Sequence, residues 1–589
     1  MVESTSPTAD AGSLSRGGPS ARLGPRVSSG LLSMALLAVS VSGGTAESPA
    51  IWGADGWAPC PARGTPELVD GVRNRLEAAR SGARLAAGGQ RIHARNALPA
   101  FYGSRAWAPA WFDGTTLSAC GRRVLETVAR ADAEGLESDD YHLDPLGALA
   151  DQVVSGTATA AERVDLELLL TDAWLTLGSH LLQGRVNPST VEAEWLANRR
   201  RADMGALLEA ALAEGDPGSA LARLRPSQPE YDRLRDKLAE LRAVAAEGGW
   251  GTVPDGPTLH PGDDAPRVPA LRVRLAAGGD LPKADANAST LFDDGLREAV
   301  VRFQTRHGLD ADGEVGPRTL QALAVPVEAR IRQVRVNLER WRWLPEELGA
   351  RHVRVNIADY RVEVWDSGSV GLEMRAVVGR AYRQTPMFSG QMSHLVLAPY
   401  WHVPPGIAAN DKLPELQRNP GYLAAQRMSL LAQGTGQPVD PASVDFGALS
   451  GAEFNRSYRI RQDPGPLNAL GQVKFMFPNV HNVYLHDTPS RELFGRAERA
   501  FSSGCVRLER PLELAEYLLA GRPEWSPERI RTAAQASSET TVRFATPIPV
   551  HILYWTSFVD VEGRVHFRPD LYERDARVQR GLDAEPPAA

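Results

Sequence analysis

The chain has 589 residues, of which 43% are hydrophobic and 23% charged, and its formal net charge is −7. This length and composition are typical of two to four globular domains with large apolar cores. A protein that binds nucleic acid usually carries a basic field for the phosphates, so the negative charge argues against such a partner.

The first 46 residues contain, in this order, the basic, apolar and small-residue regions of an export signal. Arg22 and Arg26 precede an apolar stretch from 31 to 41, and Gly44-Thr45-Ala46 fits a small-x-Ala cleavage site. We therefore predict a signal peptide over residues 1–46. The alternative is an uncleaved N-terminal anchor, although the apolar stretch is shorter than the roughly 20 residues that a membrane span needs.

The chain contains three cysteines, Cys60, Cys120 and Cys505. An oxidising compartment favours an even structural set and one free thiol. Cys60 and Cys120 could form that pair and leave Cys505 free, but the sequence alone does not determine the connectivity.

Residues 90–250 have the pattern of a helical domain. The stretch "LLLTDAWLTLGSHLL" places Leu168, Leu175 and Leu182 on one helical face, and "EYDRLRDKLAELRAV" is apolar on one face and charged on the other. Residues 251–269 are rich in Pro, Gly and Asp, which is typical of a linker.

A small helical module is predicted over residues 267–325. Leu296, Val300 and Phe303 recur at helical spacing, and Pro317 occupies a favourable first-turn position for a second helix.

From residue 351 the apolar period changes to two, as in "HVRVNIADYRVEVWD", which predicts a β-rich domain over residues 330–575. A Pro-, Gly- and Asn-rich stretch at 406–466 interrupts its strands. Because about sixty residues is long for a structureless connection, we expect a subdomain or a lid there.

The stretch "VYLHDTPSRELFGRAERAFSSGCVRLERP" contains the candidate catalytic pair, His486 and Cys505. A thiol needs a neighbouring base or cation to become a nucleophile, and an imidazole titrates near neutrality. The turn at Ser503 and Gly504 could bring backbone N–H groups of residues 503–505 onto an oxyanion, and Gly504 tolerates positive φ. The alternative is an inert buried thiol near a core histidine; the polar setting of Cys505 disfavours it.

This stretch resembles the active-site motif of the L,D-transpeptidases with a YkuD-type catalytic domain. That motif has a histidine, a spacer, and then Ser/Thr-His-Gly-Cys-hydrophobic-Arg. Here Ser503 stands in place of the second histidine, as in the large multi-domain Gram-negative, YcbB-like branch.

Other segments resemble the same branch. Residues 267–325 are similar to a peptidoglycan-binding module, "FYGSRAWAPAWFD", "GLESDDYHL" and "HLLQGRVNP" to its N-terminal scaffold, and "APYWHVPPGIA" to the strand before its capping insertion. The resemblance implies an α+β multi-domain protein: a helical N-terminal scaffold, a small helical peptidoglycan-binding module and a β-rich YkuD-type domain with an inserted capping subdomain.

The resemblance also implies a function. Cys505 would attack the bond between diaminopimelate and D-alanine of a peptidoglycan tetrapeptide stem, with His486 as general base. Release of D-alanine would leave a thioester, which the amine of a second stem would resolve as a 3→3 cross-link. The protein would then be periplasmic, use no cofactor or metal and be acylated by carbapenems.

Three further residues would line the pocket by position: Tyr484, Trp401 and Arg507. Arg507 could bind a substrate carboxylate or fix the turn by a salt bridge. Tyr484 shares a strand face with His486, and for Tyr484 and Trp401 core packing is the alternative.

Other functions are compatible with the same motif. Water in place of the acceptor amine would make the protein an L,D-carboxypeptidase or endopeptidase, and the acceptor could be a lipoprotein lysine. A non-catalytic wall-binding scaffold would leave His486 and Cys505 unexplained. A metallohydrolase is disfavoured because His-Glu-x-x-His is absent from the sequence.

Overall fold

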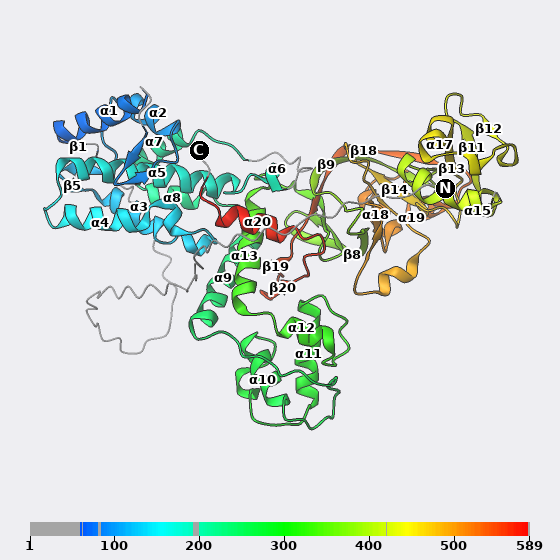
Figure 1. Cartoon of the computed structure of the whole chain (residues 1–589). Coiled ribbons are helices and arrows are strands. Elements are labelled where there is room, and N and C mark those ends of the chain that lie inside the picture. Colours follow the sequence, from blue (N-terminus) through cyan, green and yellow to red (C-terminus); the bar gives the residue numbers. More distant parts are fainter. Residues whose placement is uncertain (1–58, 62, 81–83, 192–199, 420, 587–589) are drawn as a thin grey trace, which may run out of the picture. The chain divides into compact units, whose positions relative to one another are not determined.

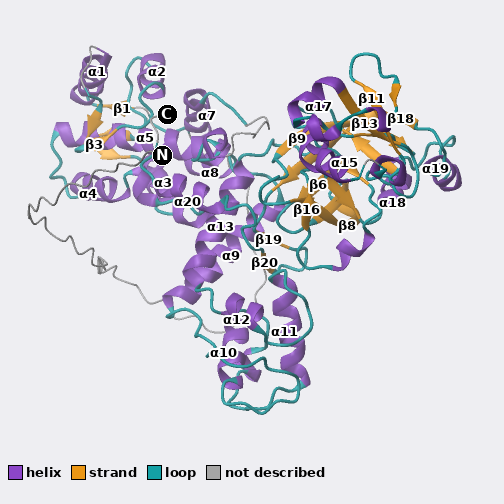
Figure 2. Cartoon of the chain, turned by 45° about the vertical axis from the view of Figure 1, so that its right-hand side comes forward, coloured by secondary structure: helices purple, strands orange, loops and turns teal. Residues whose placement is uncertain are grey.

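The computed structural model describes residues 59–61, 63–80, 84–191, 200–419 and 421–586 (Figure 1). The predicted signal at 1–46 lies outside these residues. Among the helices of the described part, none combines the length and the apolar character needed to cross a membrane. Figure 2 shows the long strands in the C-terminal part of the chain, whereas most of the N-terminal part is helical.

The N-terminal region is built around α5 (Ala160–Gln183). The helices of this region are α1 (Pro66–Arg80), α2 (Ala97–Ser104), α3 (Ala119–Val128), α4 (Leu143–Val154), α5, α6 (Pro188–Val191), α7 (Met204–Glu214), α8 (Pro217–Ala222) and α9 (Pro229–Ala246). Short strands accompany them: β1 (Arg63–Gly64), β2 (Ala86–Ala87), β3 (Gln90–Arg91), β4 (Phe112–Gly114) and β5 (Thr116–Leu117).

Helix α5 is buried on almost every side. The face predicted from the sequence is buried, and Glu167 and Asp172 outside it are fully buried as well. The burial extends beyond one face because α1, α3, α4 and α7 all pack around this helix. Its polar groups are bonded inside: Glu167 accepts hydrogen bonds from the Tyr102 hydroxyl at 2.7 Å and from the backbone N–H of Ala110 at 2.5 Å. Helix α9 does follow its prediction, with Leu234, Leu238 and Leu241 buried.

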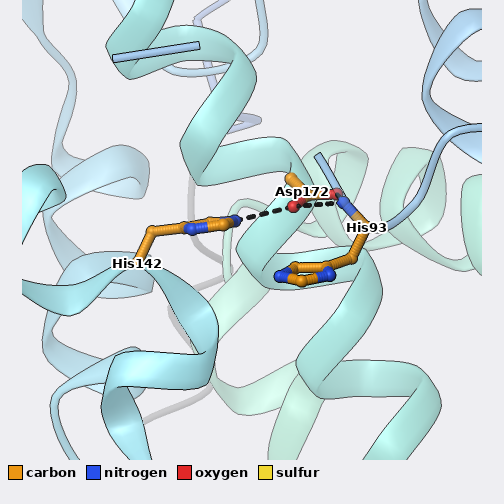
Figure 3. A group of neighbouring side chains, drawn as sticks. All are labelled: His93, His142 and Asp172. Atoms are coloured by element: carbon orange, nitrogen blue, oxygen red, sulfur yellow. Dashed lines mark hydrogen bonds and ion pairs between the residues drawn. The ribbon is translucent and has the colours of Figure 1, made fainter. Parts of the chain in front are cut away.

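Asp172 connects three segments inside this core (Figure 3). Its carboxylate accepts hydrogen bonds from the backbone N–H of His93 at 3.0 Å and of Ala94 at 2.7 Å. The Nε2 of His142, at the start of α4, lies 2.7 Å from Oδ2 of Asp172. A fully buried carboxylate is tolerable here because these donors satisfy it.

A disulfide joins Cys60 to Cys120 of α3, which confirms the pairing that the sequence left open. Among the described residues Cys505 is the free cysteine.

The small module contains α10 (Val268–Ala277), α11 (Asp294–Arg306) and α12 (Pro317–Leu323). Leu296, Val300 and Phe303 are buried on α11 as predicted, and α12 begins at Pro317. Part of the expected linker packs here too: Val253 and Leu259 join the core of the module, and Leu259 pairs with Val315.

The C-terminal domain contains a nine-stranded sheet in the order β16-β8-β17-β15-β14-β9-β18-β6-β7, and β7 also pairs with β8. Its strands are β6 (Arg351–Asn356), β7 (Arg361–Asp366), β8 (Ser369–Gly379), β9 (Phe388–Leu397), β14 (Val473–Met476), β15 (Leu485–His486), β16 (Ala500–Ser502), β17 (Val506–Leu508) and β18 (Thr540–Leu553). Helices α13 (Val327–Arg342), α18 (Pro511–Leu518), α19 (Pro527–Ala534) and α20 (Asp575–Asp583) and the hairpin β19 (Ser557–Val559) and β20 (Val565–Phe567) complete this part. The hairpin predicted over "HVRVNIADYRVEVWD" is confirmed as β6 and β7.

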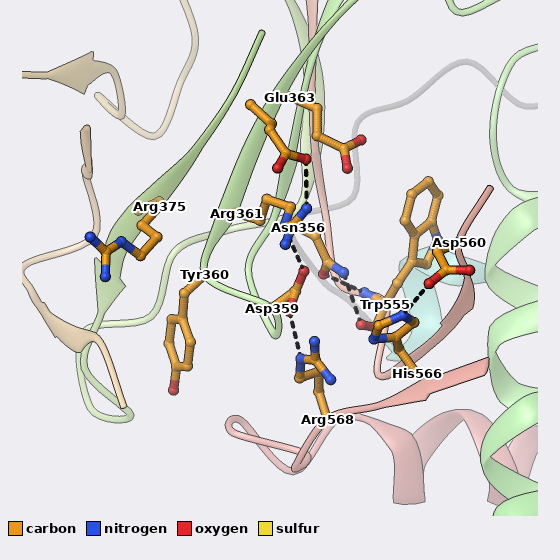
Figure 4. A network of polar contacts seen from close by, with 12 residues as sticks. Asn356, Asp359, Tyr360, Arg361, Glu363, Arg375, Trp555, Asp560, His566 and Arg568 are labelled. Atoms are coloured by element: carbon orange, nitrogen blue, oxygen red, sulfur yellow. Dashed lines mark hydrogen bonds and ion pairs between the residues drawn. The ribbon is translucent and has the colours of Figure 1, made fainter. Parts of the chain in front are cut away.

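Polar contacts hold the turn between β6 and β7 to the C-terminal segment (Figure 4). Asp359 binds both Arg361, at 3.3 Å, and the buried Arg568, at 2.5 Å. Asn356 and Trp555 exchange two hydrogen bonds, of 3.1 and 3.0 Å, and so extend the pairing of β6 with β18.

Residues 401–470 form an inserted subdomain. Its sheet has the order β10 (Trp401–His402), β13 (Tyr458–Gln462), β11 (Met428–Ala432) and β12 (Pro438–Val439). Its helices are α14 (Pro405–Ile407), α15 (Leu413–Arg418), α16 (Tyr422–Ala425) and α17 (Gly451–Ser457). Trp401, Leu416, Phe454 and Ile460 are buried together in a core that is separate from that of the nine-stranded sheet.

We expect the disulfide to stabilise the helical region. The bond closes a loop of 60 residues, and removing a constraint of this size costs about 2–5 kcal/mol. Cys60→Ser should therefore lower the thermal transition of this region while that of the β-rich domain stays in place. Calorimetry of the wild type and the variant measures both transitions; equal lowering of the two would contradict a local effect.

Candidate active site

The parallel pairing of β15 with β17 builds the site. Leu485 pairs with Val506 and His486 with Arg507, while the N–H of Val506 donates to the carbonyl of Tyr484 at 3.1 Å. Leu485 and Val506 are fully buried in the core. Because side chains alternate along a strand, Tyr484 and His486 share the opposite face with Cys505 and Arg507. The sheet thus brings together four of the residues singled out in the sequence.

The Cys505 thiol is half-buried beside Tyr484. Its sulfur lies 3.8 Å from the carbonyl oxygen of Asn482. Burial raises the pKa of the thiol to about 11, although hydrogen bonds with Tyr484 and the charge of Arg507 act to lower it. At neutral pH the group is therefore a thiol, which fits the expectation that it needs a base to become a nucleophile.

His486 is buried and neutral. Burial, followed by the charge of Arg507, lowers the pKa of its imidazole to about 3. Its Nδ1 lies 2.5 Å from the carbonyl oxygen of Asp487, which can only accept. Nδ1 therefore carries the proton, and the lone pair remains on Nε2, where a base needs it.

The carboxylate of Asp487 fixes the backbone carbonyl that binds the ring of His486. Its buried carboxylate accepts from the N–H of Thr488 at 2.6 Å, the N–H of Gln472 at 2.8 Å and the guanidinium of Arg491 at 2.6 Å. These contacts fix the carbonyl of Asp487 and, through it, the ring of His486.

Ser502 and Thr385 shape the turn before Cys505. The Ser502 hydroxyl donates to the carbonyl of Cys505 at 2.6 Å and accepts from the N–H of Gly504 at 3.0 Å. The buried hydroxyl of Thr385 donates to the carbonyl of Gly504 at 2.8 Å. Gly504 has φ +116°, the backbone freedom that the sequence suggested.

The hydrogen bond from Gly504 changes the expected oxyanion site. The N–H of Gly504 is committed to Ser502, so it is not available to a substrate. Within the described chain, the N–H groups of Ser503 and Cys505 donate to no backbone or side-chain acceptor outside the strands. They are the backbone donors left for an oxyanion, and the part expected of Gly504 is corrected to a conformational one.

Arg507 is a guanidinium without a counterion. It makes no salt bridge to any residue that the structure describes, and its buried Nε has no hydrogen-bond partner. Burial and the nearby charge of Arg380 lower its pKa. A salt bridge that fixes the turn, one of its two expected roles, is therefore not formed.

Arg383 connects the turn to the insertion. Its guanidinium donates to both carboxylate oxygens of Asp411, at 2.7 and 2.8 Å, and to the hydroxyl of Ser503 at 3.0 Å. Asp411 belongs to the insertion and Ser503 is two residues from the thiol. One side chain thus links the inserted subdomain to the turn that carries Cys505.

Trp401 lies in the core of the insertion, where Lys412 is 5.6 Å from the centre of its ring. The alternative of core packing therefore holds for this residue. Tyr484 packs against the cores of both the insertion and the main sheet, so it borders the two subdomains.

One group of possible metal ligands occurs among the described residues, and it lies away from this site. His93, His142 and Asp172 place ligand atoms within 4.8 Å of one another (Figure 3). Because the oxygens of Asp172 already accept hydrogen bonds from His142 and from two backbone N–H groups, the contacts describe a hydrogen-bonded core.

Three domain families match the chain. Residues 350–527 match an L,D-transpeptidase catalytic domain (YkuD), residues 264–323 a "Putative peptidoglycan binding domain" and residues 96–238 a scaffold domain. The chain is therefore a multi-domain protein with a YkuD-type L,D-transpeptidase catalytic domain and a peptidoglycan-binding domain.

A curated relative carries the same family name. The chain is 34% identical over 266 residues to the "Putative L,D-transpeptidase" of Haemophilus influenzae, which is 44% of this chain and 53% of that protein. The chain thus matches about half the length of this relative.

Solved structures align only loosely. An L,D-transpeptidase from Mycobacterium smegmatis is 11% identical, with 35% of this chain and 58% of that chain covered and a TM-score of 0.15. The L,D-transpeptidase LdtMt1 in complex with imipenem is 14% identical, with 35% of this chain and 59% of that chain covered and a TM-score of 0.16. We draw no argument from these alignments.

Sequence reasoning did not find Arg383, Thr385, Ser502 or Asp487. Asp487 and Ser502 lie inside the motif and could have been noticed as polar neighbours of the catalytic pair. Arg383 and Thr385 lie more than 100 positions before Cys505, and only the pairing of β8 with β16 and β17 brings their loop to the turn.

The charge of Arg507 should control the ionisation of the thiol. Its positive charge favours the thiolate, so Arg507→Gln should raise the pKa of Cys505 further above about 11. Each unit of increase lowers the thiolate fraction about tenfold at pH 8. Alkylation of Cys505 by iodoacetamide, followed by mass spectrometry between pH 7 and 10, measures this fraction. Arg418→Gln removes an exposed guanidinium in the insertion and should change nothing; equal rates in both variants would contradict the role of Arg507.

Proposed function

We propose that this protein is a cysteine-dependent L,D-transpeptidase acting on peptidoglycan tetrapeptide stems. The observation that carries the proposal is that the free Cys505 and the neutral His486 lie on the same face of two paired strands, within a region that matches a YkuD-type domain. The peptidoglycan-binding domain of the same chain supports peptidoglycan as the substrate.

In the first half-reaction the thiol attacks the carbonyl carbon of diaminopimelate in its bond to D-alanine. Because both groups start neutral, His486 Nε2 accepts the thiol proton as the carbon–sulfur bond forms, without a preformed ion pair. The N–H groups of Ser503 and Cys505 stabilise the oxyanion. His486 then returns the proton to the leaving amine of D-alanine, and a thioester remains.

In the second half-reaction an amine of another stem attacks the thioester. His486 removes a proton from that amine, the carbon–sulfur bond breaks, and the sulfur recovers a proton. The product is a 3→3 cross-link, and the thiol is regenerated.

Arg507 binds a substrate carboxylate in this proposal. A guanidinium that is partly buried without a counterion is costly, and a carboxylate of the stem peptide would supply two charge-assisted hydrogen bonds. The absence of an internal partner among the described residues favours this role over a structural one.

The insertion acts as a cap that limits access of water to the thioester. Tyr484 packs against its core, and Arg383 joins its Asp411 to Ser503. A transferase has to exclude water while its acyl-enzyme waits for the second substrate. Hydrolysis by the same site would instead make the protein an L,D-carboxypeptidase or endopeptidase.

We also propose that the protein is exported to the periplasm by its N-terminal signal, or held there by an uncleaved anchor. The disulfide between Cys60 and Cys120 supports an oxidising compartment, because such bonds rarely persist in a reducing cytosol.

Substitution of the catalytic pair tests the mechanism. Cys505→Ala should abolish both cross-linking and the mass shift produced by acylation with a carbapenem, since no other thiol is free among the described residues. His486→Gln should slow acylation by roughly 10²-fold or more, with a residual rate that rises with pH as the thiol ionises unaided. Stem-peptide products are measured by mass spectrometry. A folded Cys505→Ala protein with most of its activity would exclude the cysteine mechanism.

Loosening the contact between Arg383 and Asp411 tests the cap. Asp411→Asn removes the charge that Arg383 holds and should raise the ratio of hydrolysed to cross-linked product, with cross-linking reduced more than acylation. The matched control is Glu415→Gln, which removes the exposed ion pair with Arg418 on the same insertion. The same product ratio in Asp411→Asn and the control would contradict the capping role.

A further inference from the structure

A cavity in the helical region carries an unusual concentration of arginine. It has a volume of about 850 Å³ and lies between the end of α1, the start of α2 and the strand β3. Arg80, Arg84, Arg91 and Arg95 line it, and the rest of its wall includes the apolar side chains of Leu85 and Pro99. None of these residues belongs to the site around Cys505.

Among the residues that the structure describes, one of these four arginines has an ion-pair partner. Arg91 pairs with Glu585 at 3.0 Å, but that carboxylate is 66% exposed. In the part of the chain that the structure describes, Arg80, Arg84 and Arg95 form no ion pair. Arg91 also has a buried Nε without a hydrogen-bond partner. Arg80, Arg84 and Arg95 are exposed and Arg91 is partly buried, so water screens their mutual repulsion. Four guanidinium groups around one cavity in a chain of net charge −7 still form a local positive field that attracts anions.

The start of α2 also lines the cavity, through the N-cap residue Asn96 and through Pro99 and Ala100 of its first turn. Its backbone offers little to an anion, because Pro99 has no N–H and the N–H of Leu98 already donates to the carbonyl of Ala94. The arginines are therefore the groups that would bind an anion here.

We propose that this cavity binds a phosphate-bearing anion. A phosphate or pyrophosphate offers more oxygens and more charge than one carboxylate, so it can engage several guanidinium forks at once. The apolar part of the wall would accommodate a hydrophobic group next to the phosphate. The phosphate could come from the headgroup of an anionic lipid or from a soluble phosphate ester, and both present the same chemistry to the arginines.

Binding to two probes tests the proposal with the full chain. The first is inorganic pyrophosphate, measured by calorimetry. The second is phosphatidylcholine vesicles with and without phosphatidylglycerol, measured by co-sedimentation at low ionic strength. The test variant is Arg84→Glu/Arg95→Glu. The matched control is Arg130→Glu/Arg201→Glu, which reverses two exposed arginines of the same region outside the cavity.

Removing one arginine charge should weaken binding about 5-fold and removing two about 25-fold, so the two charge reversals of the test variant should weaken binding by at least about 25-fold. Loss of pyrophosphate binding in the test variant alone supports a soluble phosphate ligand. Loss of binding to phosphatidylglycerol vesicles alone supports a lipid headgroup. The test variant is folded if it unfolds at the same temperature as the wild type. All the proteins compared carry the same N-terminal segment.

Three outcomes overturn the proposal. The first is the absence of binding to either probe, and the second is equal binding by the test variant and the control. The third is selective binding of a disaccharide-tetrapeptide, which carries carboxylates but no phosphate, with the same dependence on Arg84 and Arg95. The activity of the Cys505 site plays no part in these measurements, so their outcome is independent of the proposed function.

Discussion

The parallel register between β15 and β17 is the constraint on which the site depends. Pairing Leu485 with Val506 buries both in the core, and this burial leaves Tyr484, His486, Cys505 and Arg507 on the other face. A shift of β15 by one residue would turn Tyr484 and His486 into the core and expose the fully buried Leu485. The hydrophobic core of the sheet therefore determines which residues can meet a substrate.

The electrostatics of the site follow from the same burial. The low polarity around His486 and Cys505 favours the neutral forms of both, with pKa values of about 3 and about 11. The positive charge of Arg507 favours the thiolate and disfavours the imidazolium, so it makes the nucleophile easier to form and the base harder to protonate. A carboxylate bound to Arg507 would reverse part of this effect, since it would neutralise the charge. In the proposed mechanism, substrate binding and proton transfer would thus be coupled through one guanidinium.

The insertion and the helical region each have a hydrophobic core of their own and a few polar contacts that join separate segments of the chain. In the insertion, Arg383 bridges Asp411 and Ser503 at the turn of the nucleophile. In the helical region, the carboxylates of Glu167 and Asp172 are fully buried on α5 and bind segments far away in the sequence. Loss of one partner would leave a buried polar or charged group unpaired, which is strongly destabilising. These contacts therefore fix a single arrangement of the elements around them.

Much of the local structure could be predicted from the sequence. Periodicity located the hairpin of β6 and β7 and the helices α9 and α11, because their apolar residues recur on a buried face, and Pro317 located the start of α12. In α5 periodicity located the apolar face but not the burial of the other faces, which comes from the helices that pack around it.

The motif identified His486, Cys505 and the flexible Gly504, since residue type and close spacing are visible in the chain itself. Only the tertiary structure decided the protonation of the pair, the commitment of the Gly504 N–H to Ser502 and the contact of Arg383 with the turn. The protonation depends on burial, and the contact of Arg383 depends on strand pairing between residues more than 100 positions apart. The bond from Gly504 to Ser502 is local, but it depends on the side-chain conformation of Ser502, which residue order does not show.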